Sequence, residues 1–180
     1  MKTIPLALLC SLFAATLPAS AASLKVDKER SRIQVDAKAT GHTFTGTLAD
    51  YQATVSGNES TLEPTGVKLT WKFSDLKTGE EKRDKEMIQW LGGGGPTGSF
   101  EFNKTWKDGG KTYAQGTLKI HGVSKTIAFP YTAKRSGDWV TIDGTASLDY
   151  TDFGLPIIST MAVMKVNPKL SVRFHLVGKS

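Results

Sequence analysis

Cysteine is almost absent from the chain: its 180 residues contain one, Cys10. This residue lies in an apolar N-terminal segment that we expect to be removed. The remaining chain then has no thiol, which excludes both disulfide cross-links and a cysteine nucleophile. A packed core must therefore provide the stability, and the chain is long enough to form one as a single domain.

Long apolar runs are also missing, except at the N-terminus. Lys2 precedes an apolar stretch over residues 4–17, and Ala19-Ser20-Ala21 supplies the small residues that a signal peptidase accepts. The stretch is too short to span a bilayer. The sequence therefore predicts a cleaved signal peptide at residues 1–21 and an exported, soluble domain at residues 22–180.

Runs of like charge are lacking too. The chain has 23 Lys and Arg against 17 Asp and Glu, a net charge of +6, and the basic residues are scattered. A nucleic-acid-binding arm needs a run of about five or six like charges, so no nucleic-acid partner is predicted. The modest basic excess favours at most transient contact with an anionic membrane surface.

Catalytic and metal-binding motifs are not found either. The three histidines, His42, His121 and His175, share no metal-ligand spacing, and no G-x-S-x-G elbow is present. We therefore predict no metal, no cofactor and no catalytic residue. The alternative is an enzyme acting on a small amphipathic substrate, with His121 or His42 as acid/base beside a carboxylate in a cavity.

The most unusual stretch that is present is GGGGPTG, residues 92–98, which formally matches the G-x-G-x-x-G dinucleotide fingerprint. That motif works only where a strand enters the loop and a helix leaves it. Here a helical pattern precedes the glycines and a strand pattern follows them, so nucleotide binding is not predicted. The run is better explained as a helix terminator and a mobile joint.

The helical pattern before the glycines is short. Thr78 and Glu81 have capping-box spacing, and Met87, Trp90 and Leu91 then recur at helical spacing. We expect this amphipathic helix to lie across one end of a barrel and to tilt on the glycine joint when a ligand enters or leaves.

Elsewhere, apolar residues alternate with polar ones. In VKLTWKF, residues 67–73, the odd positions are apolar, and LSVRFHLV, residues 170–177, sets Val172, Phe174 and Leu176 against Arg173 and His175. Roughly eight such segments, separated by turn signals, predict an all-β protein: an antiparallel barrel or sandwich with one short helix. An eight-stranded barrel either fills its interior with side chains or holds one small ligand, and the sequence leaves both possibilities open.

Several motifs resemble those of the YceI family of exported lipid-binding proteins. TLKIHGVSKTIAFP, residues 117–130, resembles the family's L-T-I-H-G-V-T-K/R-P-V segment, and LKTGEEKRDKEM, residues 76–87, resembles its T-G-x-x-x-R-D-x-x-M/L signature. SRIQVDAKATGHTFTGTL, residues 31–48, resembles its opening strand pair. DFGL, residues 152–155, resembles R-x-D-F-G-I without the arginine.

The resemblance implies a lipocalin-like eight-stranded antiparallel barrel that acts as a periplasmic carrier and not as an enzyme. The implied ligand is a long apolar lipid: a polyisoprenoid, an isoprenoid quinone or a fatty-acyl-like chain. An exposed barrel flank also offers a surface for a homodimer. The other alternative is a stress-response interaction protein with a filled core.

If strand alternation and the helical face decide which residues line the cavity, the ligand-binding residues can be named. The predicted ligand-binding wall comprises Trp71, Phe73, Met87, Trp90, Phe100, Phe102, Ile120, Phe129, Ile142 and Phe174. A β-bulge would reverse this assignment beyond the point where it occurs.

Overall fold

The structure, a computed structural model, describes residues 21–160 and 164–179. Of the expected signal peptide, therefore, only Ala21 lies within the described residues. The elements are β1 (Ala21–Val26), β2 (Arg32–Ala39), β3 (His42–Leu48), β4 (Gln52–Asn58), β5 (Pro64–Lys72), η1 (Phe73–Asp75), β6 (Leu76–Lys77), α1 (Glu81–Trp90), β7 (Thr97–Asp108), β8 (Lys111–Ile120), β9 (Val123–Ser136), β10 (Trp139–Asp149), η2 (Tyr150–Phe153), β11 (Ser159–Thr160), β12 (Met164–Lys165) and β13 (Lys169–Lys179). No helix among the described residues is long and apolar enough to cross a membrane.

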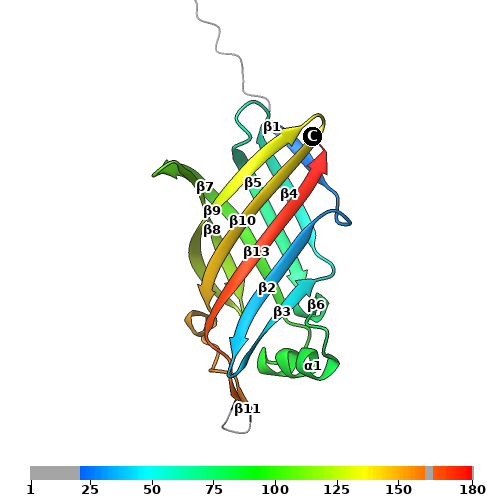
Figure 1. Ribbon diagram of the computed structural model, residues 1–180, viewed down its shortest axis with the longest axis vertical. Coiled ribbons are helices and arrows are strands. Elements are labelled where there is room, and N and C mark those ends of the chain that lie inside the picture. Colours follow the sequence, from blue (N-terminus) through cyan, green and yellow to red (C-terminus); the bar gives the residue numbers. More distant parts are fainter. Residues whose placement is uncertain (1–20, 161–163, 180) are drawn as a thin grey trace, which may run out of the picture.

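The sheet closes on itself. Strands β4, β5, β7, β8, β9, β10 and β13 pair in that order, all antiparallel, and β1 pairs with both β4 and β13. β1 and β2 both pair with β13, one after the other, so together they form one long strand with a break. In the same way β3 pairs with β2 and β4 pairs with β1, so β3 and β4 form a second interrupted strand. The predicted fold is confirmed: the protein is an eight-stranded antiparallel barrel with one helix (Figure 1).

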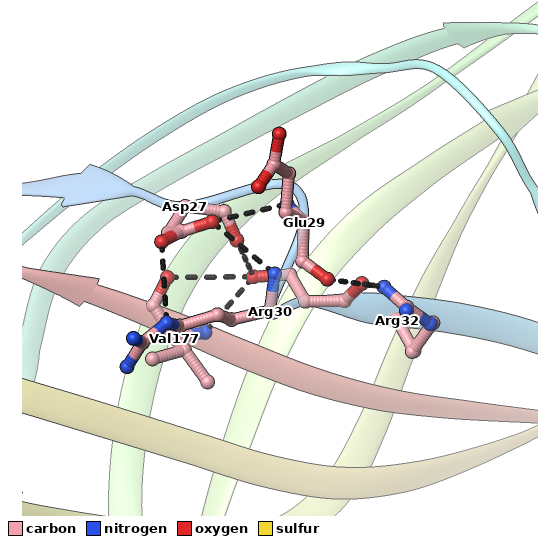
Figure 2. A network of polar contacts seen from close by, with 6 residues as sticks. Asp27, Glu29, Arg30, Arg32 and Val177 are labelled. Atoms are coloured by element: carbon pink, nitrogen blue, oxygen red, sulfur yellow. Dashed lines mark hydrogen bonds and ion pairs between the residues drawn. The ribbon is translucent and has the colours of Figure 1, made fainter.

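The break between β1 and β2 is fixed by polar contacts (Figure 2). The Asp27 carboxylate accepts hydrogen bonds from the backbone N–H groups of Glu29 and Arg30, at 3.0 and 3.2 Å. The buried Ser31 hydroxyl donates to the Asp27 carbonyl at 2.6 Å and accepts from the Val177 N–H at 3.0 Å. These bonds satisfy the backbone where the ladder stops and hold the break against β13.

A second break, between β3 and β4, lies beside the first. The Lys28 ammonium forms an ion pair with Asp50 at 2.6 Å and lies 5.5 Å from the centre of the Tyr51 ring. The two contacts join the interrupted strands across the place where their backbones are unpaired. The barrel wall therefore stays continuous through side chains at this point.

Strand alternation places the apolar side chains inside. On β13, Val172, Phe174 and Leu176 face the interior, whereas Arg173 and His175 are exposed. A β-bulge between Phe102 and Lys104 reverses the assignment on the last part of β7, where Thr105 turns inward and hydrogen-bonds Tyr131 at 3.2 Å. The bulge follows Phe102, so it moves none of the predicted wall residues.

The helix begins differently from the prediction. Its N-cap residue is Glu80, whose side chain makes no capping hydrogen bond, so the predicted capping box of Thr78 and Glu81 is wrong. The reason is Gly79, whose φ of 80° turns the chain so that Thr78 lies alongside the first turn. The Thr78 hydroxyl donates instead to the Asp84 carboxylate at 2.6 Å.

The glycine run ends the helix as predicted. The N–H of Gly92 donates to the Gln89 carbonyl at 3.0 Å and that of Gly93 to the Ile88 carbonyl at 2.9 Å, the bonding pattern of a Schellman motif. All four glycines, Gly92 to Gly95, have φ between 67° and 93°. This left-handed conformation favours glycine, which adopts it without steric cost. The tilting of the helix on this joint stays a prediction.

One ion pair on the outer wall gives a pH-dependent prediction. Arg173 on β13 binds Asp36 on β2 through two nitrogens, and this hydrogen bonding holds the pKa of Asp36 below its ordinary value. A lowered carboxyl pKa adds stability above the unfolded-state pKa of about 3.9, and this contribution is lost as the pH falls through the folded-state value. Because the pair is partly exposed, Asp36→Asn should lower the free energy of unfolding at pH 7 by under about 1 kcal/mol. In urea titrations the difference between the parent and Asp36→Asn should shrink as the pH falls through the lowered folded-state pKa, and a difference that stayed constant with pH would contradict the assignment.

Candidate functional site

The barrel encloses a cavity of about 660 Å³. This volume falls in the range of about 300–1,000 Å³ that is usual for small-molecule sites. The interior is therefore not filled by side chains, which leaves the alternative of a filled-core protein without a structural basis. The wall between the two ends of the barrel is made by aliphatic and aromatic residues of all the long strands.

Charged residues line the cavity only near its two ends, within the part of the chain that the structure describes. Glu59 and Arg135 lie at the end that carries the β4–β5 and β9–β10 turns, and Glu80, Lys82, Arg83 and Glu86 lie at the end that carries α1 (Figure 1). An apolar chain can therefore occupy the length of the barrel without meeting a charge, while a polar end group finds charged partners at either end.

Three glycines keep the interior open. An ideal Cβ on Gly98 would lie 2.2 Å from Trp71 Cζ2, one on Gly116 2.2 Å from Phe100 Cζ, and one on Gly144 2.2 Å from Phe174 Cζ. The large rings therefore lie flat against the neighbouring strands, in space that any other residue would occupy. An alanine at Gly98 would displace the Trp71 ring, and one at Gly116 or Gly144 would also crowd a backbone carbonyl, at 2.6 and 2.9 Å.

The middle of the cavity is aromatic. The Phe129 ring lies 5.4 Å from that of Phe174 in an edge-to-face arrangement and 5.8 Å from that of Phe100, measured between ring centres. Phe129 is buried, and its strand partner Ala114 is small enough to leave the ring room. Tyr131 also lines the cavity, and burial raises the pKa of its hydroxyl, so it remains a neutral phenol at physiological pH.

The helical end of the cavity is lined by α1 and by residues that follow η2. Met87 and Trp90 line the cavity, as does Leu91, the C-cap residue of α1. The Trp90 indole N–H donates to the Pro156 carbonyl at 2.9 Å, and its ring meets Tyr150 edge-on, 5.1 Å between centres.

Tyr150 stands where the R-x-D-F-G-I motif has its arginine. It is buried, its hydroxyl donates to the Val166 carbonyl at 2.9 Å, and the Ile158 N–H donates to it at 3.2 Å. A neutral phenol thus ties Ile158 and Val166 to η2 at this position. Burial also raises the pKa of this hydroxyl.

All the residues predicted for the ligand wall line the one cavity: Trp71, Phe73, Met87, Trp90, Phe100, Phe102, Ile120, Phe129, Ile142 and Phe174. Their contact with a ligand stays a prediction. Sequence reasoning missed Tyr150, which lies in η2, outside any alternating strand, and Arg83, which lines the cavity from the same face of α1 as Met87. Arg83 and Met87 are four residues apart on a helix, and this spacing was the signal that could have placed Arg83 in the cavity wall.

The histidines are not gathered into a catalytic arrangement. His42 lines the cavity beside Phe44, and His121 lies exposed in the β8–β9 turn with φ of 51°. Neither has a hydrogen-bonded carboxylate among the described residues. His175 does pair with Asp143, at 2.6 Å, but on the exposed outer wall. Nor do three or more His, Cys, Asp or Glu side chains come together as metal ligands anywhere in residues 21–160 or 164–179.

A sequence profile of the YceI-like domain matches residues 24–178. The chain belongs to the YceI-like family. The match covers every strand that closes the barrel, and the family resemblance seen in the motifs is thereby confirmed. YceI-like barrels are folds of a binding type and are not a known enzyme family.

Solved structures show the same fold. The crystal structure of Burkholderia cenocepacia BcnA has a TM-score of 0.72 and 19% identity, over 86% of this chain and 100% of that one. The YceI protein of Campylobacter jejuni has a TM-score of 0.61 and 19% identity, over 75% and 84%. No curated protein sequence matches the chain at a significant level. At such low identity these relatives establish the fold alone.

Proposed function

We propose that this YceI-like protein is a periplasmic carrier that holds the chain of a long apolar lipid inside its barrel and catalyses no reaction. The lipid is a polyisoprenoid, an isoprenoid quinone or a fatty-acyl-like molecule. The observation that carries the proposal is the cavity of about 660 Å³, whose lining, as far as the structure describes it, bears no charge between the two ends of the barrel. The expected signal peptide supports the periplasmic location.

The size of the cavity favours a long chain. At roughly 30 Å³ for a group the size of a water molecule, the cavity has room for on the order of twenty methylene-sized groups. Burying a methylene contributes about 0.8 kcal/mol, so such a chain gains on the order of 16 kcal/mol. Association costs about 4–15 kcal/mol, which a chain of half that length would barely offset.

Transfer of the lipid to or from a membrane belongs to the same proposal. Trp106 on β7 is exposed, stacks on Tyr113 of β8 with 5.4 Å between ring centres, and has the Lys104 ammonium 5.9 Å away. Aromatic rings with neighbouring lysines suit the headgroup layer of an anionic membrane. This hairpin is the surface that supports transient membrane contact.

Native mass spectrometry of the protein taken directly from the periplasm tests the function. We expect a bound mass of several hundred daltons that organic extraction removes and that added lipid of the same class restores. The extracted protein should keep its strand content by circular dichroism, which separates loss of ligand from unfolding. A protein that carries no lipid and takes up none of the three classes would refute the carrier function.

A further inference from the structure

One face of α1 turns a charged side chain toward the apolar cavity. Arg83, Met87 and Trp90 follow one another at helical spacing and all three line the cavity. The face therefore runs from a guanidinium near the start of the helix to a thioether and an indole near its end. A ligand lying against this row of three side chains would meet the guanidinium at one end only.

Arg83 differs from the other charged residues around the cavity. Among the described residues that line it, Glu59, Glu80, Lys82, Glu86 and Arg135 are exposed, whereas Arg83 is half-buried. A charge that is partly removed from water interacts more strongly with a counter-charge than an exposed one does. The exposed residues are surrounded by solvent and are poorly placed to discriminate between ligands.

The guanidinium is held in place without being neutralised. Its Nε donates to Thr78 Oγ1 at 2.9 Å, its Nη2 donates to the Thr78 carbonyl at 3.1 Å, and its carbon lies 4.4 Å from the centre of the Phe44 ring. These three partners are neutral. Within the described residues no carboxylate forms an ion pair with Arg83.

The nearest carboxylate in sequence is engaged elsewhere. Asp84 accepts hydrogen bonds from the Thr78 N–H at 3.0 Å and from the Thr78 hydroxyl at 2.6 Å. The two oxygens of Thr78 therefore orient the Arg83 guanidinium, while the N–H and hydroxyl of Thr78 hydrogen-bond the Asp84 carboxylate. The arrangement leaves a positioned cation, with its Nη1 unbound among the described residues, at the cavity wall.

We propose that Arg83 recognises the oxyanion of a lipid head group, a carboxylate or a phosphate, so that the ligand lies in the barrel with its anionic end at α1. The proposal rests on the proposed carrier function and specifies which lipids it concerns. A guanidinium presents its donors in a plane that matches two oxygens of a carboxylate or phosphate. The apolar chain then extends past Met87 toward the aromatic middle of the cavity.

Binding of matched probes tests the proposal. Palmitate, hexadecyl phosphate and hexadecanol have the same chain length and differ in the head group. Each can displace a fluorescent fatty acid at concentrations below its solubility limit or critical micelle concentration. The unaltered protein should bind both anions at least about tenfold more tightly than the alcohol, equal to about 1.4 kcal/mol. Inorganic phosphate and acetate, which lack the chain, should not compete.

The variants assign the preference to one residue. Arg83→Gln should bind hexadecanol as the unaltered protein does and lose the preference for the anions. Lys85→Gln, which removes a charge from the opposite, exposed side of α1, should retain it. Lys82→Gln removes the exposed lining charge next to Arg83 in sequence and tests whether the preference belongs to that residue instead.

The outcomes separate this inference from the carrier function. Binding of none of the three probes would refute the carrier function for straight-chain lipids. Equal binding of all three by the unaltered protein would leave the carrier function intact and overturn the role of Arg83, even if Arg83→Gln failed to fold. A preference that survives Arg83→Gln and disappears in Lys82→Gln would overturn it as well.

Discussion

Phe129→Glu is expected to abolish lipid retention at neutral pH and to recover part of it on acidification. Phe129 lies between the rings of Phe100 and Phe174 in the apolar middle of the cavity. A carboxylate there has no cation to pair with among the described residues that line this part of the wall, and an unpaired buried charge is strongly unfavourable. An apolar chain would have to lie against that charge.

The pH dependence follows from the same cause. Removal from water disfavours the charged form, so the pKa of the new carboxyl should be raised above the ordinary value of about 4.3. Protonation on acidification then removes the charge, and ligand should be regained as the pH falls through the raised pKa. At pH 7.5 we expect affinity for a long-chain lipid to fall by at least about a hundredfold, equal to about 2.7 kcal/mol.

Phe129→Gln is the matched control, because the glutamine amide has nearly the shape of the glutamate carboxyl but does not titrate in this range. It should bind more weakly than the parent and show no recovery between pH 7.5 and pH 5. Circular dichroism of both variants confirms that the barrel has formed. A folded Phe129→Glu variant that holds lipid as well as the parent at pH 7.5 would show that the ligand does not lie against Phe129.

Strand alternation, together with the helical spacing of Met87 and Trp90, was sufficient to predict these residues of the cavity wall, because both are local properties of the chain. Val172, Phe174 and Leu176 face inward wherever β13 lies in the barrel, since each residue's side is decided by its neighbours in sequence. The same reasoning fails only at a bulge, and the one on β7 comes after Phe102. The residues of the wall could therefore be named without any knowledge of which strands pair.

Features that depend on pairing could not be predicted in this way. Gly98 and Trp71 are 27 positions apart, and only the register of β5 against β7 places the indole over the glycine.

The prediction of the capping box failed for a different reason. Thr78 and Glu81 have the right spacing, but the left-handed Gly79 between them turns the threonine toward Asp84. Whether the interior was filled or open also depended on where the rings lie and not on how many there are.

The glycines beneath the rings lead to the second large prediction. Gly98→Ala should narrow the cavity and weaken the binding of long chains while leaving the barrel folded. The three atoms nearest to an ideal Cβ at this position all belong to the Trp71 indole, at 2.2, 2.4 and 2.9 Å, so the nearest obstacle is a side chain. An ordinary contact between carbon atoms is about 3.5 Å, and the ring must therefore move by roughly 1 Å.

The ring can move only toward the interior, since the strand lies on its other side. Each methylene that loses its place in the wall costs about 0.8 kcal/mol, so the loss of two would weaken binding by about tenfold. The overpacking itself should lower the free energy of unfolding by about 1–3 kcal/mol. Gly116 is less suited to this test, because a Cβ there would also lie 2.6 Å from the backbone carbonyl of Glu101.

A series of fatty alcohols of increasing length measures the effect most directly, because no anionic end ties them to Arg83. Gly98→Ala should bind the shortest member nearly as well as the parent and fall progressively behind as the chain lengthens, because a short chain can lie away from the displaced indole and a chain that fills the cavity cannot. Gly66→Ala is the matched control: it lies on β5, the strand of Trp71, and a Cβ there meets only the Ser56 hydroxyl, at 2.9 Å. That variant should follow the parent at every length. If Gly98→Ala loses affinity equally for short and long chains, the indole lies on the path of every ligand, and the ring does not set the limit on chain length.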